Sequence, residues 1–392
     1  MLYKNINPIQ LRCFFNFIEK IKLEIKARNY FTFSSHAAFG SSSIAWLKIL
    51  GRNKFAVHPF FIPKVIFITS AIFLGIPFRW YERLKFKTKI QKQKIKDPVF
   101  ILGHLRSGTT YIHYLLSKDP QFSYCTTNQA ILPHLFLTGS GIISPMIAKA
   151  LPKYRPMDNL KMGSEKPKEE DFALASFGPE SLIPGFYFPK NYYRNFLKDV
   201  VFENNPLGEI KWKNNFDFFL KKLSFAGKGK TLLLKSPSNT ARVKQILELY
   251  PNAKFIHIHR NPYEVYASTC HLFEKMLPIL SFQKPIKEEL EKDILAVYSD
   301  LYKKYFLEKK RIPQGNLVEI EYKVFTEKPL ESLQNIYKKL NIEGFEKATP
   351  FIEAEIKSYK DYQTNKLLLS EETKKNIAKN WDFAFKEMGY SK

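Results

Sequence analysis

A short loop rich in glycine and hydroxyl side chains follows an apolar segment near residue 100. Gly103 and Gly108 are separated by four residues, which is the spacing of a Walker A loop, but Thr109 stands where a nucleotide triphosphatase carries lysine. Backbone N–H groups at a helix N-terminus, glycines that permit close approach and neighbouring hydroxyls are enough to bind a phosphate group. The loop therefore predicts a bound phosphorylated nucleotide, and the threonine argues against ordinary ATP or GTP hydrolysis.

Three cationic side chains lie just after apolar segments that read as strands. These are Arg106, Lys235 and Arg260. In open parallel sheets ligands bind at the carboxyl ends of the strands, and gathering three cations at one edge is costly without an anion between them. Ser268 follows Arg260 by eight residues, about two helical turns, so a guanidinium fork and a hydroxyl can reach one phosphate. Taken alone, an arginine after a strand is more typical of a surface ion pair.

Apolar strands alternate with helical patterns through most of the chain. Strands are predicted at 99–102, 231–234, 255–258 and 317–320, and helices at 109–118, 240–249, from 262 onward and at 329–340. This alternation predicts an α/β fold, a P-loop-like parallel sheet flanked by helices on both faces. Residues 97–392 are expected to form this α/β domain.

The composition favours an anionic partner. The chain has 392 residues with 62 basic against 37 acidic side chains, a net charge of +25. No nucleic-acid-binding module is legible, so no nucleic acid is expected. The cysteines, Cys13, Cys125 and Cys270, match no metal-ligand spacing, so no metal site is expected and a reducing, cytoplasmic location is the simpler interpretation.

Residues 1–96 are expected to form a helical N-terminal region, which has two open interpretations. The apolar run 65–78 is shorter than the ~20 residues of a membrane span. Extended back through Phe60, the run is compatible with a single membrane-spanning helix. A markedly basic stretch follows it, opposed only by Glu82. An apolar run followed by a basic stretch is typical of a peripheral or monotopic helix in the interface of an anionic membrane. A buried helix with a solvated lysine-rich successor fits equally well.

Two motifs in order resemble those of the PAPS-dependent sulfotransferases, which move a sulfuryl group from 3′-phosphoadenosine-5′-phosphosulfate (PAPS) to an acceptor. Residues 100–110, with the core Arg-Ser-Gly-Thr-Thr, are similar to that family's 5′-phosphosulfate loop. Residues 255–268 resemble its 3′-phosphate motif, and 234–237 resemble the segment between the two. The likeness is closest to the broad, largely microbial branch with the Gly-His-x-Arg-Ser-Gly-Thr-Thr loop. It implies transfer to a hydroxyl, less often an amine, with no metal required, and the N-terminal region points to a lipid or glycan acceptor.

The resemblance also implies roles for individual residues. The residues expected to bind the donor are Arg106, Ser107, Gly108, Thr109, Thr110, Arg260 and Ser268. Lys235 is the candidate for stabilising the bridging oxygen or the transferred group. Many relatives carry a histidine base shortly after this lysine, but residues 236–239 contain none.

Glu169 and Glu170 are the candidate general bases that remain. The same carboxylates after Pro167 are also what an ordinary helix N-terminus looks like. His104 beside the loop is a further residue able to face the acceptor, although a structural role suits it better.

Two other functions compete with sulfuryl transfer. An atypical P-loop kinase or phosphotransferase would need magnesium-dependent ATP binding, which the absence of lysine at position 109 disfavours. A non-catalytic nucleotide-binding protein of the membrane surface would retain the loop without turnover.

Overall fold

A parallel five-stranded sheet lies at the centre of the residues that the computed structural model describes, which are 36–158, 160–360 and 367–392. The strands are ordered β2-β3-β1-β4-β5 and every neighbouring pair is parallel. Their bounds are β1 Val99–Leu102, β2 Phe122–Tyr124, β3 Thr231–Lys235, β4 Lys254–His259 and β5 Leu317–Glu321. The predicted α/β fold with a P-loop-like parallel sheet is confirmed.

Alternate residues of β1 supply the hydrophobic cores on the two faces of the sheet. Phe100 and Leu102 pack in the larger core with residues of α11 (Pro206–Ala226), α12 (Val243–Leu249) and α14 (Lys287–Glu308). Val99 and Ile101 pack in the smaller core with α5 (Thr109–Leu116), α16 (Pro329–Lys339) and α17 (Phe345–Ser358). All four residues of β1 are buried, as expected for a parallel strand covered on both faces.

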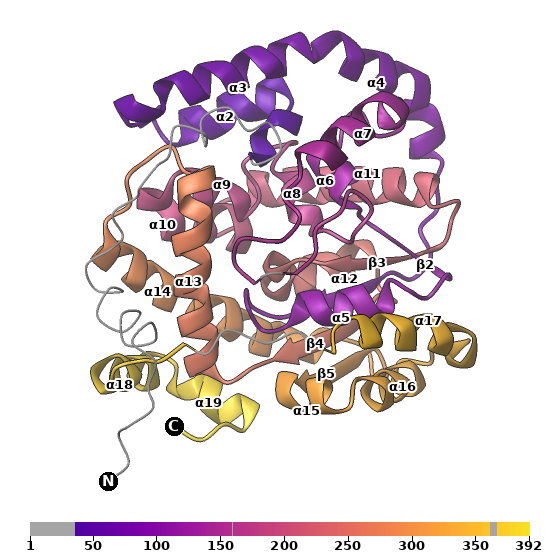
Figure 1. Ribbon diagram of the computed structural model, residues 1–392, viewed down its shortest axis with the longest axis vertical. Helices are drawn as coiled ribbons and strands as arrows, with labels where there is room; N and C mark the ends of the chain where they lie inside the picture. The colour runs from indigo at the N-terminus through magenta and orange to yellow at the C-terminus, as the bar shows by residue number, and fades with distance from the viewer. Residues whose placement is uncertain (1–35, 159, 361–366) are drawn as a thin grey trace.

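An outer layer of three helices covers one side of the molecule, drawn in indigo and violet in Figure 1. It consists of α2 (Ser43–Arg52), α3 (Ile62–Leu74) and α4 (Ile76–Gln91). Within the described residues no single helix has the length and apolarity of a membrane span. Taken together, Pro59–Leu74 and Ile76–Gln91 have the length and apolarity of a span, but the two helices are bent by 42° relative to each other.

Nine further helices complete the described part of the chain. They are α6 Thr127–Ile131, α7 Ser140–Ala150, α8 Glu170–Leu174, α9 Ile183–Tyr187, α10 Tyr192–Phe196, α13 Pro262–Leu280, α15 Tyr322–Glu327, α18 Glu371–Asn380 and α19 Asp382–Met388. Short 3-10 turns occur at Ala37–Gly40, Pro59–Phe61, Pro189–Asn191, Pro237–Ala241 and Lys309–Arg311, and a π turn at Leu197–Val201.

Two local differences from the sequence-based expectation bear on the site. The three-residue strand β2 was not predicted, because so short a segment carries no periodicity. The helix predicted from 240 begins at Val243, after the 3-10 turn Pro237–Ala241. In that turn the Thr240 hydroxyl accepts a hydrogen bond from the Gly103 N–H at 2.8 Å, which fixes the start of the phosphate loop.

Candidate functional site

The phosphate loop joins the end of β1 to the first turn of α5. Gly103 has φ +146° and Gly108 has φ +94°, a region that side-chain-bearing residues avoid. A Cβ on Gly108 would also strike the ring of Tyr322. Ser107 and Thr109 are buried, and the Tyr111 N–H donates to the Gly108 carbonyl at 3.0 Å, so the N–H groups of Thr109 and Thr110 are the ones that a helix start leaves for a ligand. The loop therefore has the glycines, hydroxyls and helix N-terminus that bind a phosphate group.

Arg106 connects this loop to two distant segments. Its Nε donates to the Ser268 hydroxyl of α13 at 2.9 Å, and its Nη1 donates to the Asp158 carboxylate at 2.8 Å. Arg106 itself has φ +71°, which is uncommon for a residue other than glycine. Burial opposes the charge on Asp158, but Arg155 and Arg106 outweigh it and hold the pKa of that carboxyl below its ordinary value.

Arg260 lies beside the loop without a hydrogen bond to Ser268. Its guanidinium stacks over the ring of Tyr322 at 4.6 Å, and its Nε donates to the exposed Glu264 carboxylate at 2.5 Å. The same tyrosine ring also lies against Gly108. The structure thus gathers Arg260, Ser268 and the loop at one edge of the sheet, with Arg106 and Tyr322 between them.

Lys235 ends β3 and forms an ion pair with Glu169 at 2.5 Å. The lysine is only 3% exposed, and burial is the main reason that its pKa is lowered. Burial disfavours the charge on Glu169, but Lys235 and Lys168 outweigh it and keep the pKa of the carboxyl below its ordinary value. Glu169 is therefore ionised at neutral pH, and one of its oxygens is bonded to the lysine.

A small pocket brings this ion pair together with the loop. The residues that line it are Thr110, Tyr114, Thr127, Arg155, Met162, Gly163, Lys166, Pro167, Lys168, Glu169 and Lys235. Four of them are cations against one carboxylate. Arg155 donates to the Thr110 hydroxyl at 3.4 Å, and burial lowers the pKa of Lys168 to about 8. Such a pocket suits an anion held between β1 and β3.

Glu170 differs from its neighbour Glu169 in having no access to the pocket. One carboxylate oxygen accepts the Lys235 backbone N–H at 3.1 Å and the other accepts the Asn239 amide at 2.5 Å. The residue is fully buried, and burial raises its pKa to about 7. These contacts assign Glu170 to supporting the strand end. Asp171 continues this support by accepting hydrogen bonds from Ser181 and Ser238.

His104 is a structural residue. It is buried, its Nδ1 bonds the Leu105 carbonyl at 2.9 Å, and its ring packs edge-on against Tyr298. Burial lowers its pKa to about 4.

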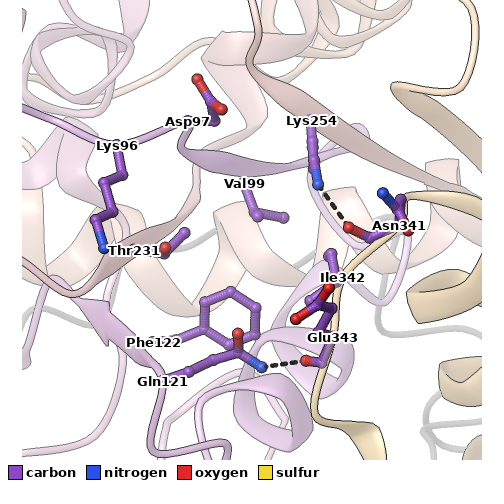
Figure 2. A pocket seen from close by; sticks show the side chains of 10 residues that line it. All are labelled: Lys96, Asp97, Val99, Gln121, Phe122, Thr231, Lys254, Asn341, Ile342 and Glu343. Carbon is purple, nitrogen blue, oxygen red and sulfur yellow. Dashed lines mark hydrogen bonds between the residues drawn. The ribbon is translucent and has the colours of Figure 1, made fainter.

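A larger cavity of about 370 Å³ lies at the opposite edge of the sheet. Figure 2 shows Val99, Phe122, Thr231 and Lys254 around it, the first residues of β1 to β4. Because ligands of parallel sheets bind at the carboxyl ends of the strands, this cavity is separate from the site.

Sequence reasoning did not identify three residues that lie near the site. Tyr322 directly follows β5, so the strand-end rule that located Lys235 and Arg260 would have found it. Arg155 and Lys168 lie outside strands. Only the fold shows that they approach Thr110 and Lys235.

Comparisons with known proteins find sulfotransferases. Residues 98–347 match the model of the sulfotransferase family. The chain is 30% identical over 356 residues to the omega-hydroxy-beta-dihydromenaquinone-9 sulfotransferase Stf3 of Mycobacterium bovis and to that of Mycobacterium tuberculosis, covering 90% of this chain and 91% of each relative.

Two solved structures share the fold. Sulfotransferase STF9 from Mycobacterium avium has a TM-score of 0.67 at 16% identity, covering 94% of this chain and 97% of that one. Sulfotransferase STF1 from Mycobacterium tuberculosis has a TM-score of 0.61 at 15% identity, covering 88% and 93%. These structures show the fold, and the family match favours sulfuryl transfer over the kinase and non-catalytic alternatives.

Proposed function

The chain belongs to the sulfotransferase family and acts as a sulfotransferase, and from this premise we propose that it transfers the sulfuryl group of PAPS to the hydroxyl of a lipid. The observation that carries the choice of donor is the pairing of two anion-binding features at one sheet edge. One is the Gly103–Gly108 loop with α5, and the other is formed by Arg260 over the Tyr322 ring and by Ser268, which is bonded to Arg106 of the loop. A nucleotide with phosphates on both the 5′ and 3′ positions uses both.

The residues present fit this donor. The loop and the N-terminus of α5 would hold the 5′-phosphosulfate, where the Gly108 position has no room for a side chain. Arg260 is held by one exposed carboxylate, so a phosphate can replace Glu264 at little cost. Because a guanidinium binds phosphate with two parallel hydrogen bonds, Arg260 and the Ser268 hydroxyl are suited to the 3′-phosphate.

The chemistry follows from the two groups that share the pocket. The acceptor oxygen forms a bond to sulfur while the bond from sulfur to the bridging phosphate oxygen breaks. Glu169 takes the acceptor proton, and the Lys235 ammonium stabilises the charge that develops on the bridging oxygen. The products are a sulfate ester and adenosine 3′,5′-bisphosphate.

The acceptor is proposed to be a hydroxylated isoprenoid lipid. The 30% identical relatives are sulfotransferases of a hydroxylated dihydromenaquinone, and the match extends over nine-tenths of both chains. An alcohol on an apolar tail also suits a protein with a large apolar outer layer in α2 to α4.

A donor assay separates the two anion-binding features. Purified protein should bind adenosine 3′,5′-bisphosphate more tightly than adenosine 5′-monophosphate, by about 10- to 100-fold if Arg260 makes a charge-assisted pair worth ~1.5–3 kcal/mol. Arg260→Gln should remove this preference and leave the monophosphate affinity unchanged. Equal affinities in the wild type would contradict PAPS as the donor.

A turnover assay tests the reaction itself. Labelled PAPS and an omega-hydroxylated menaquinone should yield a labelled lipid, and Lys235→Gln should reduce that yield strongly. Lys230→Gln, an exposed lysine just before β3, is the matched control and should retain full activity. Label in a soluble metabolite but never in lipid would refute the proposed acceptor.

A further inference from the structure

The outer helices α2 to α4, with the segment that joins α2 to α3, carry most of the large apolar side chains exposed in the described part of the chain. Twelve of the 22 such side chains lie between residues 44 and 84. They are Ile44, Leu47, Phe55, Phe60, Ile62, Ile66, Phe73, Leu74, Phe78, Trp80, Tyr81 and Leu84. We call this set the apolar outer face. A soluble protein rarely exposes so many large apolar side chains on neighbouring helices unless it binds a partner or a membrane.

The opposite side of the same helices is firmly attached to the rest of the protein. On α3, Ile68 and Ile72 are buried in the main hydrophobic core. On α4, Glu82 is buried and forms an ion pair with Lys222 of α11. The same carboxylate accepts hydrogen bonds from the Leu137 and Thr138 N–H groups at 3.0 and 2.7 Å. A charged pair held inside the protein keeps α4 from leaving the core to cross a bilayer.

The charge around the apolar outer face has one sign. Residues 36–96 contain twelve lysines and arginines, and their single acidic residue, Glu82, is the buried partner of Lys222. The exposed cations of α4 and the segment after it are Arg83, Lys85, Lys87, Lys89, Lys92, Lys94 and Lys96. No carboxylate in this range offsets their charge at the surface.

Aromatic and aliphatic side chains bordered by lysines are the features of a helix that lies in the interface of an anionic bilayer. Figure 1 shows α2, α3 and α4 together along one outer edge of the molecule. The bend of 42° and the buried inner side disfavour a span. We propose that the apolar outer face inserts into the interface of an anionic lipid bilayer, so that the protein is a monotopic membrane protein.

Vesicle sedimentation of the full-length protein tests this proposal. Binding is expected to vesicles of phosphatidylcholine with phosphatidylglycerol, and to be much weaker with phosphatidylcholine alone or at high salt. The triple variant Phe78→Asp, Trp80→Asp, Leu84→Asp should bind at least tenfold more weakly. Its matched control, Leu207→Asp, Ile210→Asp, Leu307→Asp, replaces equally exposed apolar residues elsewhere and should bind as the wild type does.

A charge series tests the second component of the same surface. Lys85→Gln, Lys87→Gln, Lys89→Gln should weaken binding to anionic vesicles at least tenfold at low salt, since each lysine near such a surface contributes several-fold. Lys338→Gln, Lys339→Gln, Lys347→Gln removes the same charge from exposed positions elsewhere and should have a smaller effect. Nucleotide affinity should be unchanged in all variants, which shows that they are folded.

Three results would overturn the proposal. The first is vesicle binding that the outer-face variants do not reduce, or no vesicle binding at all. The second is retention of the wild type on vesicles after alkaline carbonate at high salt, which identifies a span. The third is a wild-type dimer in solution that the apolar triple variant converts to a monomer, which identifies a second copy as the occupant of the face.

Discussion

Replacing Glu169 by glutamine removes a proton acceptor while keeping the shape of the pocket. The Lys235 ammonium retains a hydrogen-bond partner, because the amide oxygen of glutamine can accept where the carboxylate oxygen does at 2.5 Å. The pocket loses its one carboxylate, so its four cations bind an anion at least as well as before. Glu169→Gln should therefore change catalysis and leave donor binding intact.

The expected loss in kcat follows from the role of the carboxylate. General base catalysis contributes about 10²- to 10⁴-fold, so the activation free energy should rise by about 3–5 kcal/mol. Glu170→Gln is the matched control one residue away. Because both oxygens of Glu170 are bonded inside the protein, its substitution should change the free energy of unfolding by about 1 kcal/mol and kcat by less than tenfold.

The assay measures release of adenosine 3′,5′-bisphosphate from PAPS at saturating acceptor, together with calorimetric affinity for that nucleotide. A loss of kcat in Glu169→Gln at unchanged affinity would support the assignment. The reasoning would be refuted if Glu170→Gln lost as much turnover as Glu169→Gln while both variants bound nucleotide normally.

Three further predictions follow from the loop and its supports. Gly108→Ala places a methyl group against the Tyr322 ring at a residue with φ +94°. Nucleotide affinity, measured by calorimetry, should fall at least tenfold, and the free energy of unfolding should fall by about 1–3 kcal/mol in thermal unfolding. Gly315→Ala is the control for backbone strain alone, because Gly315 has φ +85° and lies in open space. Arg106→Lys cannot bond both Ser268 and Asp158, so donor affinity should weaken about tenfold in titration calorimetry, and an unchanged affinity would show that Arg106 only closes the loop. The pKa of Glu170 is raised on folding to about 7, so between about pH 4.5 and pH 7 the folded protein holds a proton on Glu170 that the unfolded chain has lost. Glu170 therefore stabilises the fold at low pH, and this contribution of at most about 3 kcal/mol is lost as the pH rises through that range. Urea unfolding across that range should show a steeper fall for the wild type than for Glu170→Gln, and parallel curves would contradict the raised pKa.

The sheet was predictable because its strands are short apolar runs whose ends carry the chemistry. β1, β3, β4 and β5 were all found from sequence, and the strand-end rule correctly placed Lys235 and Arg260 at one edge. β2 was not, since three residues give no pattern. The loop was recognisable because glycines at this spacing between an apolar strand and a helix are typical of a phosphate-binding turn.

The partners of each site residue were beyond the sequence. Ser268 was expected beside Arg260, and the structure bonds it to Arg106. The sequence left Glu169 and Glu170 equivalent, and only burial and the contacts of Asn239 and Lys235 separate them. Such choices depend on side chains that approach from distant segments, which no local pattern records. The division of the chain at residue 96 stays a prediction, and so does its cytoplasmic or membrane location. Residues 1–35, which include Cys13, lie outside the part that the structure describes.

The contacts of Arg106 also determine when the loop can form during folding. Its left-handed backbone is held by Asp158 and Ser268, which lie 52 and 162 residues further along the chain. Contacts of such long sequence separation form late, because the chain entropy lost in closing them must first be offset by the surrounding core. A ribosome-bound chain that has emerged only through α5 has the motif in its sequence without the shape that binds nucleotide. The donor site is in this sense a product of completed folding, and it becomes functional only after α13 has docked.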